Sequence, residues 1–147
     1  MLKGLTISMV YAGGETTSTS SYQPVSHSFI ELHNNRLDLQ DVNLNGISLQ
    51  YSNTTGANWI VYPLKGIIPY GHSFLIRCAP CSDVNVNTTV VDLTNDYDFD
   101  LPNLKISNTR FKLLLTVGTT PCLVANPMTV GIESTVFTDG YIDLVGA

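Results

Sequence analysis

Short stretches of alternating apolar and polar residues, separated by Asn-, Gly- and Pro-rich turns, fill residues 29–76. Alternation with period two places every second side chain on one face of an extended strand. The pairs and triplets that share a face are Ile30 and Leu32, then Ile47, Leu49 and Tyr51, then Phe74 and Ile76. The turns fall at residues 34–35, 53–56 and 69–71, whose residue types favour chain reversal. The stretch therefore predicts locally connected antiparallel sheet.

The order of motifs along the chain resembles a known family. FIEL is followed by an Asn turn, L-x-G-x-S-L-Q-Y-S, a Trp-containing strand, G-x-I-P-x-G-x-x-x-L-I and a closing D-L-V-G. This succession is similar to the lamin-tail domain, closer to its bacterial and phage-type members than to nuclear lamins. The resemblance implies an immunoglobulin-like β-sandwich. The chain departs from it at Ile47, where many members have Trp, at the additional residues 40–42, and over residues 78–110.

The pattern predicts an all-β, antiparallel sandwich of about seven to nine strands. Residues 1–147 are expected to form a single domain, the N-terminal module of a longer polypeptide. The expected strands are 5–9, 27–33, 46–52, 58–62, 71–77, 111–117, 121–124 and 141–145, with a weaker signal over 86–93. The expected core consists of Ile30, Leu32, Leu49, Phe74, Ile76, Leu113, Leu115 and Leu144.

The charge content argues against a nucleic-acid partner, and the lack of a long apolar run argues against a membrane. Charged residues make up 13% of the chain, the net charge is −5, and seven basic residues are spread along it. Nucleic-acid recognition needs a concentrated positive patch. The residues after Met1 alternate and do not form the apolar core of a signal peptide, and no apolar run approaches the ~20 residues of a membrane span. These features do not assign the protein to a cellular compartment, and a viral particle is one option for its location.

Cysteines and aspartates are the candidate metal ligands in this sequence. Cys78 and Cys81 form a single C-x-x-C, and a structural zinc site needs four ligands, so no metal is expected. A local disulfide or two free thiols remain as alternatives, with Cys122 standing alone. Asp96, Asp98 and Asp100 alternate, which predicts a solvent-facing rim strand. A weak cation site at these three carboxylates is the alternative.

No catalytic constellation is present, so the protein is not expected to be an enzyme, and no cofactor is expected. The sequence lacks G-x-S-x-G, and its three His residues lie in or beside predicted strands, where a structural role is favoured. Glu31 is expected either to pair with Arg77 or to face solvent. A general-acid role would require a second carboxylate placed near it.

The expected function is docking on protein, by self-association or within a larger assembly. The segment Asn58, Trp59, Ile60, Val61, Tyr62 carries no charge, although edge strands are normally guarded by charge or Pro. Asn58, Trp59, Ile60 and Tyr62 are therefore the expected interface, unless Trp59 packs inward. A virus-particle component, such as a capsid decoration or head-fibre base, fits this surface. The alternative is an accessory domain that targets a nuclease or other hydrolase. A lectin platform of Trp59, Tyr62 and Tyr70 ranks third, and a small-molecule ligand is not expected.

Overall fold

The computed structural model describes residues 4–12, 25–81, 91–107, 109–127 and 136–145, the last range by its backbone. This part of the chain is all-β, as predicted, and contains seven longer strands and three strands of two residues. The strands are β1 (Leu5–Tyr11), β2 (His27–Asn34), β3 (Val42–Asn43), β4 (Ile47–Ser52), β5 (Ile60–Pro63), β6 (Ile67–Ile68), β7 (Ser73–Pro80), β8 (Phe99–Asp100), β9 (Arg110–Val117) and β10 (Val136–Val145).

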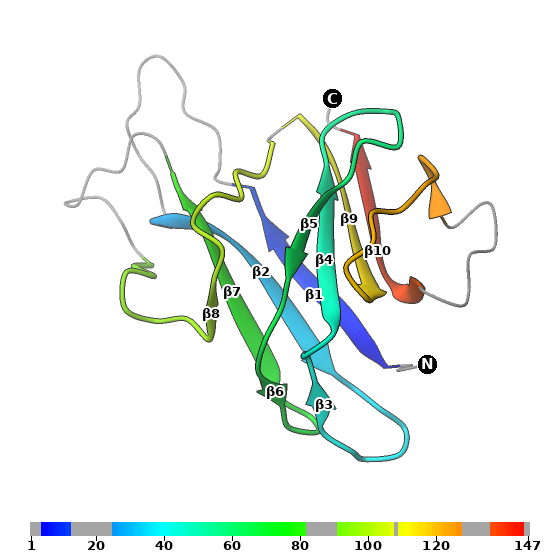
Figure 1. Cartoon of the computed structure of the whole chain (residues 1–147). Helices are drawn as coiled ribbons and strands as arrows, with labels where there is room; N and C mark the ends of the chain where they lie inside the picture. Colours follow the sequence, from blue (N-terminus) through cyan, green and yellow to red (C-terminus); the bar gives the residue numbers. More distant parts are fainter. Residues whose placement is uncertain (1–3, 13–24, 82–90, 108, 128–135, 146–147) are drawn as a thin grey trace.

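The strands form a sandwich of two four-stranded sheets, ordered β1-β2-β7-β8 and β10-β9-β4-β5. Figure 1 shows the two sheets facing each other, with the short β3–β6 pair closing one end. Neighbouring strands are antiparallel, except that β8 runs parallel to β7, with Ile76 opposite Phe99. Two parallel strands cannot be joined by a hairpin turn.

The core lies between the inner faces of the two sheets. Seven of the eight expected core residues are buried there: Ile30, Leu32, Leu49, Phe74, Ile76, Leu113 and Leu115. The eighth, Leu144, belongs to the strand whose side chains are outside the described part. The connection between β8 and β9 adds buried Leu101, Leu104 and Ile106. Its backbone bonds to β7 through Ala79 N–H and Leu104 C=O at 2.9 Å, so it also closes one side of the sandwich.

Residues 118–127, which we call the strap, cover the outer face of β4 and β9. All six residues of β4 are buried. Its inner residues face the core, and two of its outer residues, Ser48 and Gln50, bond to the strap. Ser48 Oγ donates to Gly118 C=O at 2.7 Å, and Gln50 Nε2 donates to Thr120 C=O at 2.9 Å. Cys122 N–H donates back to Gln50 Oε1 at 2.9 Å. Hydrogen bonds between β4 side chains and the strap backbone therefore hold the strap on this face.

The strap corrects one strand prediction. Residues 121–124 were expected to form a strand, but they have no strand pairing, since the Cys122 N–H is bonded by the Gln50 side chain. β7 also extends three residues beyond its predicted end, through Cys78 to Pro80. Of the predicted signal over 86–93, residues 86–90 lie outside the described part, and Val91 makes an isolated bridge to Val25.

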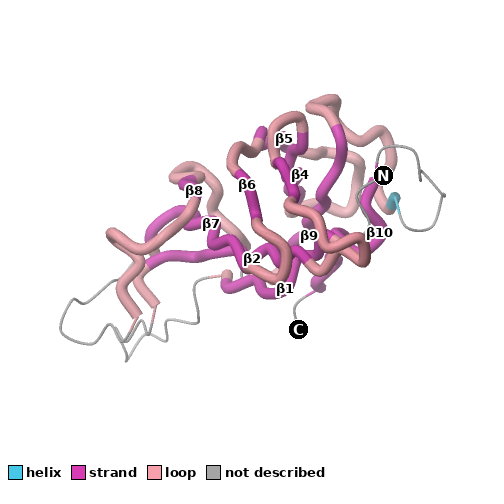
Figure 2. Tube along the Cα trace, turned by 90° about the horizontal axis from the view of Figure 1, so that it is seen from below, coloured by secondary structure: helices cyan, strands magenta, loops and turns pink. Residues whose placement is uncertain are grey.

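Figure 2 gives a second view of the layers, in which the described segments are strands and loops apart from one short helical piece, drawn in cyan. No described helix has the length and apolarity needed to cross a membrane.

Candidate protein-docking site

Strand β5, at the end of the β10-β9-β4-β5 sheet, carries the predicted interface. The strand begins at Ile60, so Asn58 and Trp59 belong to the approach before it. Among the described strands, β5 pairs with β4 on one side only, with Tyr62 opposite Leu49 and Ile60 opposite Tyr51. The expectation that this uncharged segment forms a sheet edge is therefore confirmed.

The free edge of β5 offers few backbone donors. Leu64 N–H donates to Ile47 C=O at 2.9 Å, which sets the phase of the antiparallel ladder. Since hydrogen-bonded and non-bonded pairs alternate, the peptide groups of Ile60 and Tyr62 turn toward β4, and those of Val61 and Pro63 turn outward. Pro63 has no N–H, so Val61 supplies the one outward N–H within the strand. This edge therefore offers more side-chain surface than backbone donors.

Ile60 is the residue that most clearly reaches solvent on this edge. It is 55% exposed, although it shares the inner face of the sheet with its cross-strand partner Tyr51. Tyr62, two residues on, packs partly against the core, and its burial raises the pKa of its hydroxyl. Asn58 is exposed and donates to Thr54 Oγ1 at 3.2 Å. Ile60 is therefore the centre of the exposed edge, with Asn58 and Tyr62 beside it.

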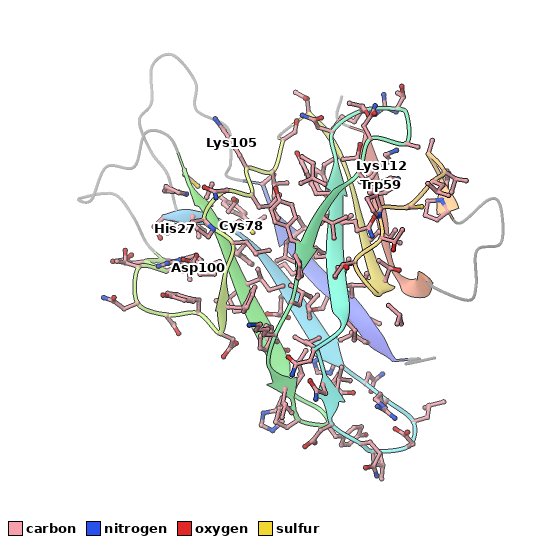
Figure 3. All side chains as sticks on the ribbon, in the orientation of Figure 1. His27, Trp59, Cys78, Asp100, Lys105 and Lys112 are labelled. Carbon is pink, nitrogen blue, oxygen red and sulfur yellow. The ribbon has the colours of Figure 1, made fainter. Side chains whose placement is uncertain are left out.

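Trp59 points into the protein, in agreement with the inward-packing alternative. Its indole is buried against Leu114, and its Nε1–H donates to Val124 C=O in the strap at 2.8 Å. Figure 3 shows Trp59 together with Lys112, whose Nζ lies 4.8 Å from the ring centroid. Trp59 therefore holds the strap and contributes little surface to a partner or to a sugar-binding platform.

Lys112, a buried cation under the strap, has no counterpart in the sequence-based expectations. Its Nζ donates to Gly56 C=O at 2.8 Å and to Ala125 C=O at 2.7 Å, and it faces the Trp59 ring. These groups replace the water lost on burial of an ammonium group. In the sequence, Lys112 occupies the polar position of an alternating strand and so resembles a solvent-facing residue. Nothing in the pattern distinguishes it.

The three cysteines are free thiols, which settles the choice left open for Cys78 and Cys81. Cys78 is buried in the core at the inward position of β7, and burial raises the pKa of its thiol to about 12. Cys81 lies just beyond the strand and is partly exposed. A thiol with so high a pKa is a poor nucleophile and metal ligand, because both roles require the thiolate. Cys78 is a core residue.

Two of the three alternating aspartates, Asp98 and Asp100, anchor their segment to β7. Asp98 Oδ2 accepts the Leu75 N–H at 2.7 Å, and Asp100 makes two bonds, of 2.9 and 2.8 Å, to the Arg77 guanidinium. The Arg77 guanidinium also stacks over the Tyr97 ring, 3.8 Å from its centroid. Among the described residues, no three His, Cys, Asp or Glu side chains converge on a common point.

Arg77 therefore pairs with Asp100 and not with Glu31. The Glu31 carboxylate instead accepts the Ser8 hydroxyl at 2.8 Å, on the outer side of the β1–β2 pair. His27 lies near the Arg77–Asp100 pair, and its pKa is lowered by burial and by the nearby Arg77 charge. Its Nδ1 lies 2.7 Å from Ser26 Oγ, which also accepts the Leu93 N–H at 2.8 Å. These contacts are structural in character.

The Arg77–Asp100 pair predicts a pH-dependent contribution to stability. The bonds from Arg77 hold the pKa of Asp100 below its ordinary value of 3.8. A depressed carboxyl pKa stabilises the fold above the unfolded-state value, and this contribution disappears as pH falls through the folded-state value. Asp100→Asn should lower the free energy of unfolding by about 1 kcal/mol at pH 7. Urea unfolding of both proteins from pH 7 to pH 2.5 measures the difference between their free energies of unfolding. A difference that stays constant below pH 3.8 would contradict the assignment.

Comparison of the sequence with models of protein families and with curated proteins finds no match.

Proposed function

We propose that this domain is a non-enzymatic structural and protein-interaction module that docks on a larger protein assembly through the β5 edge. The observation that carries the proposal is the exposure of Ile60 on an uncharged edge strand. A sheet edge without charged residues lacks the feature that normally prevents its pairing with another chain. The assembly we favour is a virus particle, with the domain as a capsid decoration or the base of a head fibre.

Two further observations support this function. The motif order resembles the lamin-tail domain, and we propose an immunoglobulin-like arrangement of that type for the sandwich. In addition, polar side chains such as Asp98, Asp100 and Arg77 bond to one another or to the backbone instead of converging on a reactive centre. An accessory domain of a nuclease or other hydrolase would dock through the same edge, so the identity of the partner separates the two.

The Ile60→Lys substitution tests the proposed edge. Lysine at an exposed strand position keeps the domain folded, with a change in unfolding free energy within about 0.5 kcal/mol. A charge placed in an apolar contact should weaken incorporation into the native assembly by about tenfold or more. The measurement is the fraction of the variant that co-purifies with the assembly when it is produced beside the unsubstituted protein.

Val117→Lys is the matched control, because Val117 is also β-branched and about half exposed but lies on β9. It should enter the assembly as the unsubstituted protein does. If Ile60→Lys folds and is incorporated normally, the β5 edge is not the interface.

A further inference from the structure

The loop between β2 and β3 projects two leucines into solvent. Leu37 is 96% exposed and Leu39 63% exposed. The loop that carries them lies at the end of the sandwich where β3 and β6 lie (Figure 1). Exposed Ile67 of β6 and Tyr70 after it lie on the neighbouring connection. The Asp41 carboxylate ties the two connections together by accepting the Tyr70 N–H at 3.2 Å. We call Leu37, Leu39, Ile67 and Tyr70 the apolar tip.

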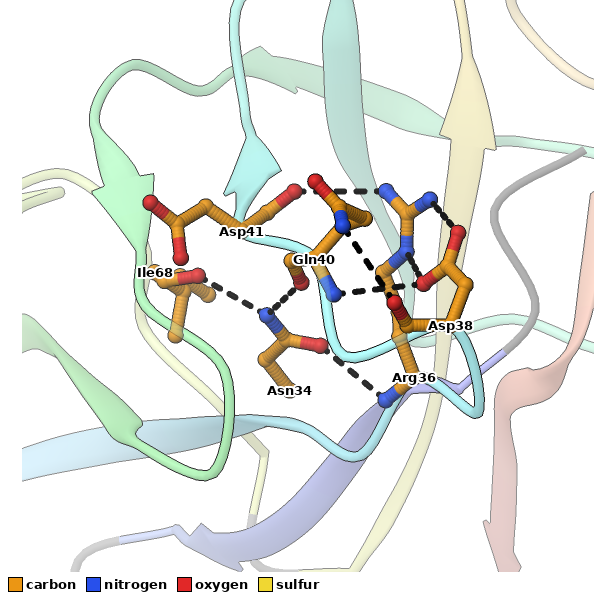
Figure 4. Close-up of polar contacts among 6 residues, drawn as sticks. All are labelled: Asn34, Arg36, Asp38, Gln40, Asp41 and Ile68. Atoms are coloured by element: carbon orange, nitrogen blue, oxygen red, sulfur yellow. Dashed lines mark hydrogen bonds and ion pairs between the residues drawn. The ribbon is translucent and has the colours of Figure 1, made fainter.

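A polar network beneath the tip fixes the shape of the loop (Figure 4). Asn34, which is fully buried, donates to both Gln40 C=O and Ile68 C=O at 2.9 Å. Its Oδ1 accepts the Arg36 N–H at 3.1 Å. The Arg36 guanidinium binds both carboxylate oxygens of Asp38 and donates to Asp41 C=O at 3.2 Å. The loop is therefore held in one conformation with its leucines outside, which lowers the entropic cost of binding.

Leu39 adopts a backbone conformation that disfavours its own side chain. Its φ is +61°, in the left-handed region that Gly or Asn usually occupies. Its N–H donates to Arg36 C=O at 3.2 Å and closes the turn. A strained leucine that is also exposed gains nothing from core packing. Strain of this kind concentrates at sites of function.

The charged side chains around the apolar tip distinguish a cationic partner from an anionic lipid surface. The side chain of Asp38 is 54% exposed and that of Arg36 only 18%, so the pair presents mainly its carboxylate. Asp41 adds a further exposed carboxylate. The register of β3 and β6 places Lys65 at the opposite end of this ladder from Asp41. Among the described charged residues, those flanking the leucines thus favour a cationic partner and oppose an anionic lipid surface.

We infer that the apolar tip inserts Leu37 and Leu39 into an apolar pocket of a partner protein whose rim carries Lys or Arg side chains. Two leucines on a rigid projection have the form of anchor residues that fill a pocket. The exposed carboxylates of Asp38 and Asp41 then face the basic rim. The inference rests on the proposed function in one respect, namely that the domain binds another protein. It concerns a surface separate from the β5 edge.

The test uses the full chain with p-benzoylphenylalanine in place of Leu37 or Leu39, irradiated in its native source. The same photo-reactive residue in place of Leu123, which is highly exposed in the strap, is the control. We expect both tip positions to cross-link to one protein, at apolar residues flanked by Lys or Arg. The Leu123 position should not give this product.

The cross-linked protein, once purified, becomes the probe for affinity measurements. Leu39→Gly removes the anchor and relieves the left-handed strain, so Tm should stay the same or rise. The Kd should increase by about tenfold, and 0.5 M NaCl should weaken binding of the unsubstituted domain. Unchanged affinity in the Leu39→Gly variant would overturn the inference.

Three other outcomes would also overturn it: cross-linking to phospholipid together with sedimentation on phosphatidylcholine–phosphatidylserine vesicles, a cross-linked dimer of the domain, or no cross-linked product. The Ile60→Lys variant separates this inference from the proposed function. If that variant enters the assembly and the Leu39→Gly variant does not, the β5 edge fails and the tip stands. If the Leu39→Gly variant enters the assembly and the Ile60→Lys variant does not, the inference about the apolar tip fails and the proposed function stands.

Discussion

Leu113→Ala is expected to lower the free energy of unfolding by about 2–5 kcal/mol, the usual range for removing a fully buried leucine. Leu113 is inaccessible to solvent at the centre of β9, opposite Tyr51 on one side and Ile142 on the other. Its cross-strand neighbours are held in place by the pairing of β9 with β4 and β10, so they cannot collapse into the space that the substitution leaves. Urea denaturation followed by far-ultraviolet circular dichroism measures the loss.

Leu123→Ala is the matched control for this prediction, because it makes the same substitution at a side chain that is highly exposed. Its effect should remain within about 0.5 kcal/mol. Equal effects at the two positions would show that Leu113 does not occupy the core, and would place the inner and outer faces of β9 in doubt.

The sheet and its inner face could be predicted because period two is a local signal. In β9, Leu113 and Leu115 alternate with Lys112 and Thr116, and the former pair faces the core. Pairing with β4 and β10 then follows from the need to bury one face of each strand. Pro63, at the end of β5, is a second local indication of an edge strand, because its missing N–H costs no ladder bond there.

The outer face of β4 and β9 could not be predicted, because it depends on a segment distant in sequence. Ser48, Gln50 and Lys112 occupy polar positions of alternating strands, which normally face solvent. They are buried because residues 118–127 return across them, and a period of two carries no information about such a return. Only Leu114, an apolar residue at an outward position, is a local indication that this face is covered.

The apolar tip was missed for a related reason. Leu37 and Leu39 alternate with Asp38 and Gln40, a pattern that a short strand would also show. Their exposure depends on Asn34, whose side chain holds the loop through Gln40 C=O and Ile68 C=O. Asn is read from sequence as a turn residue, whether or not its side chain organises a longer loop.

Gln50→Leu is expected to lower the free energy of unfolding by about 2–4 kcal/mol and to loosen the strap. Gln50 is fully buried and is bonded to the strap at two points, Thr120 C=O and Cys122 N–H. Leucine has a similar volume but leaves both groups without this partner, and each unsatisfied group costs about 1–3 kcal/mol. Two such groups would cost about 2–6 kcal/mol together, and water that partly replaces the lost bonds of the strap keeps the expected loss in the lower half of that range.

Cys122 supplies a local readout of the same event, because its own N–H is one of the bonds removed. Alkylation of Cys122 by iodoacetamide, followed by mass spectrometry of the peptide, should become faster in Gln50→Leu under native conditions. Cys78, buried in the core with a thiol pKa of about 12, should stay unreactive in both proteins and reports global unfolding. Ser48→Ala, which removes the single bond to Gly118 C=O, should give a smaller increase. If Gln50→Leu destabilises the protein while Cys122 reacts at its original rate, Gln50 supports the sheet and not the strap.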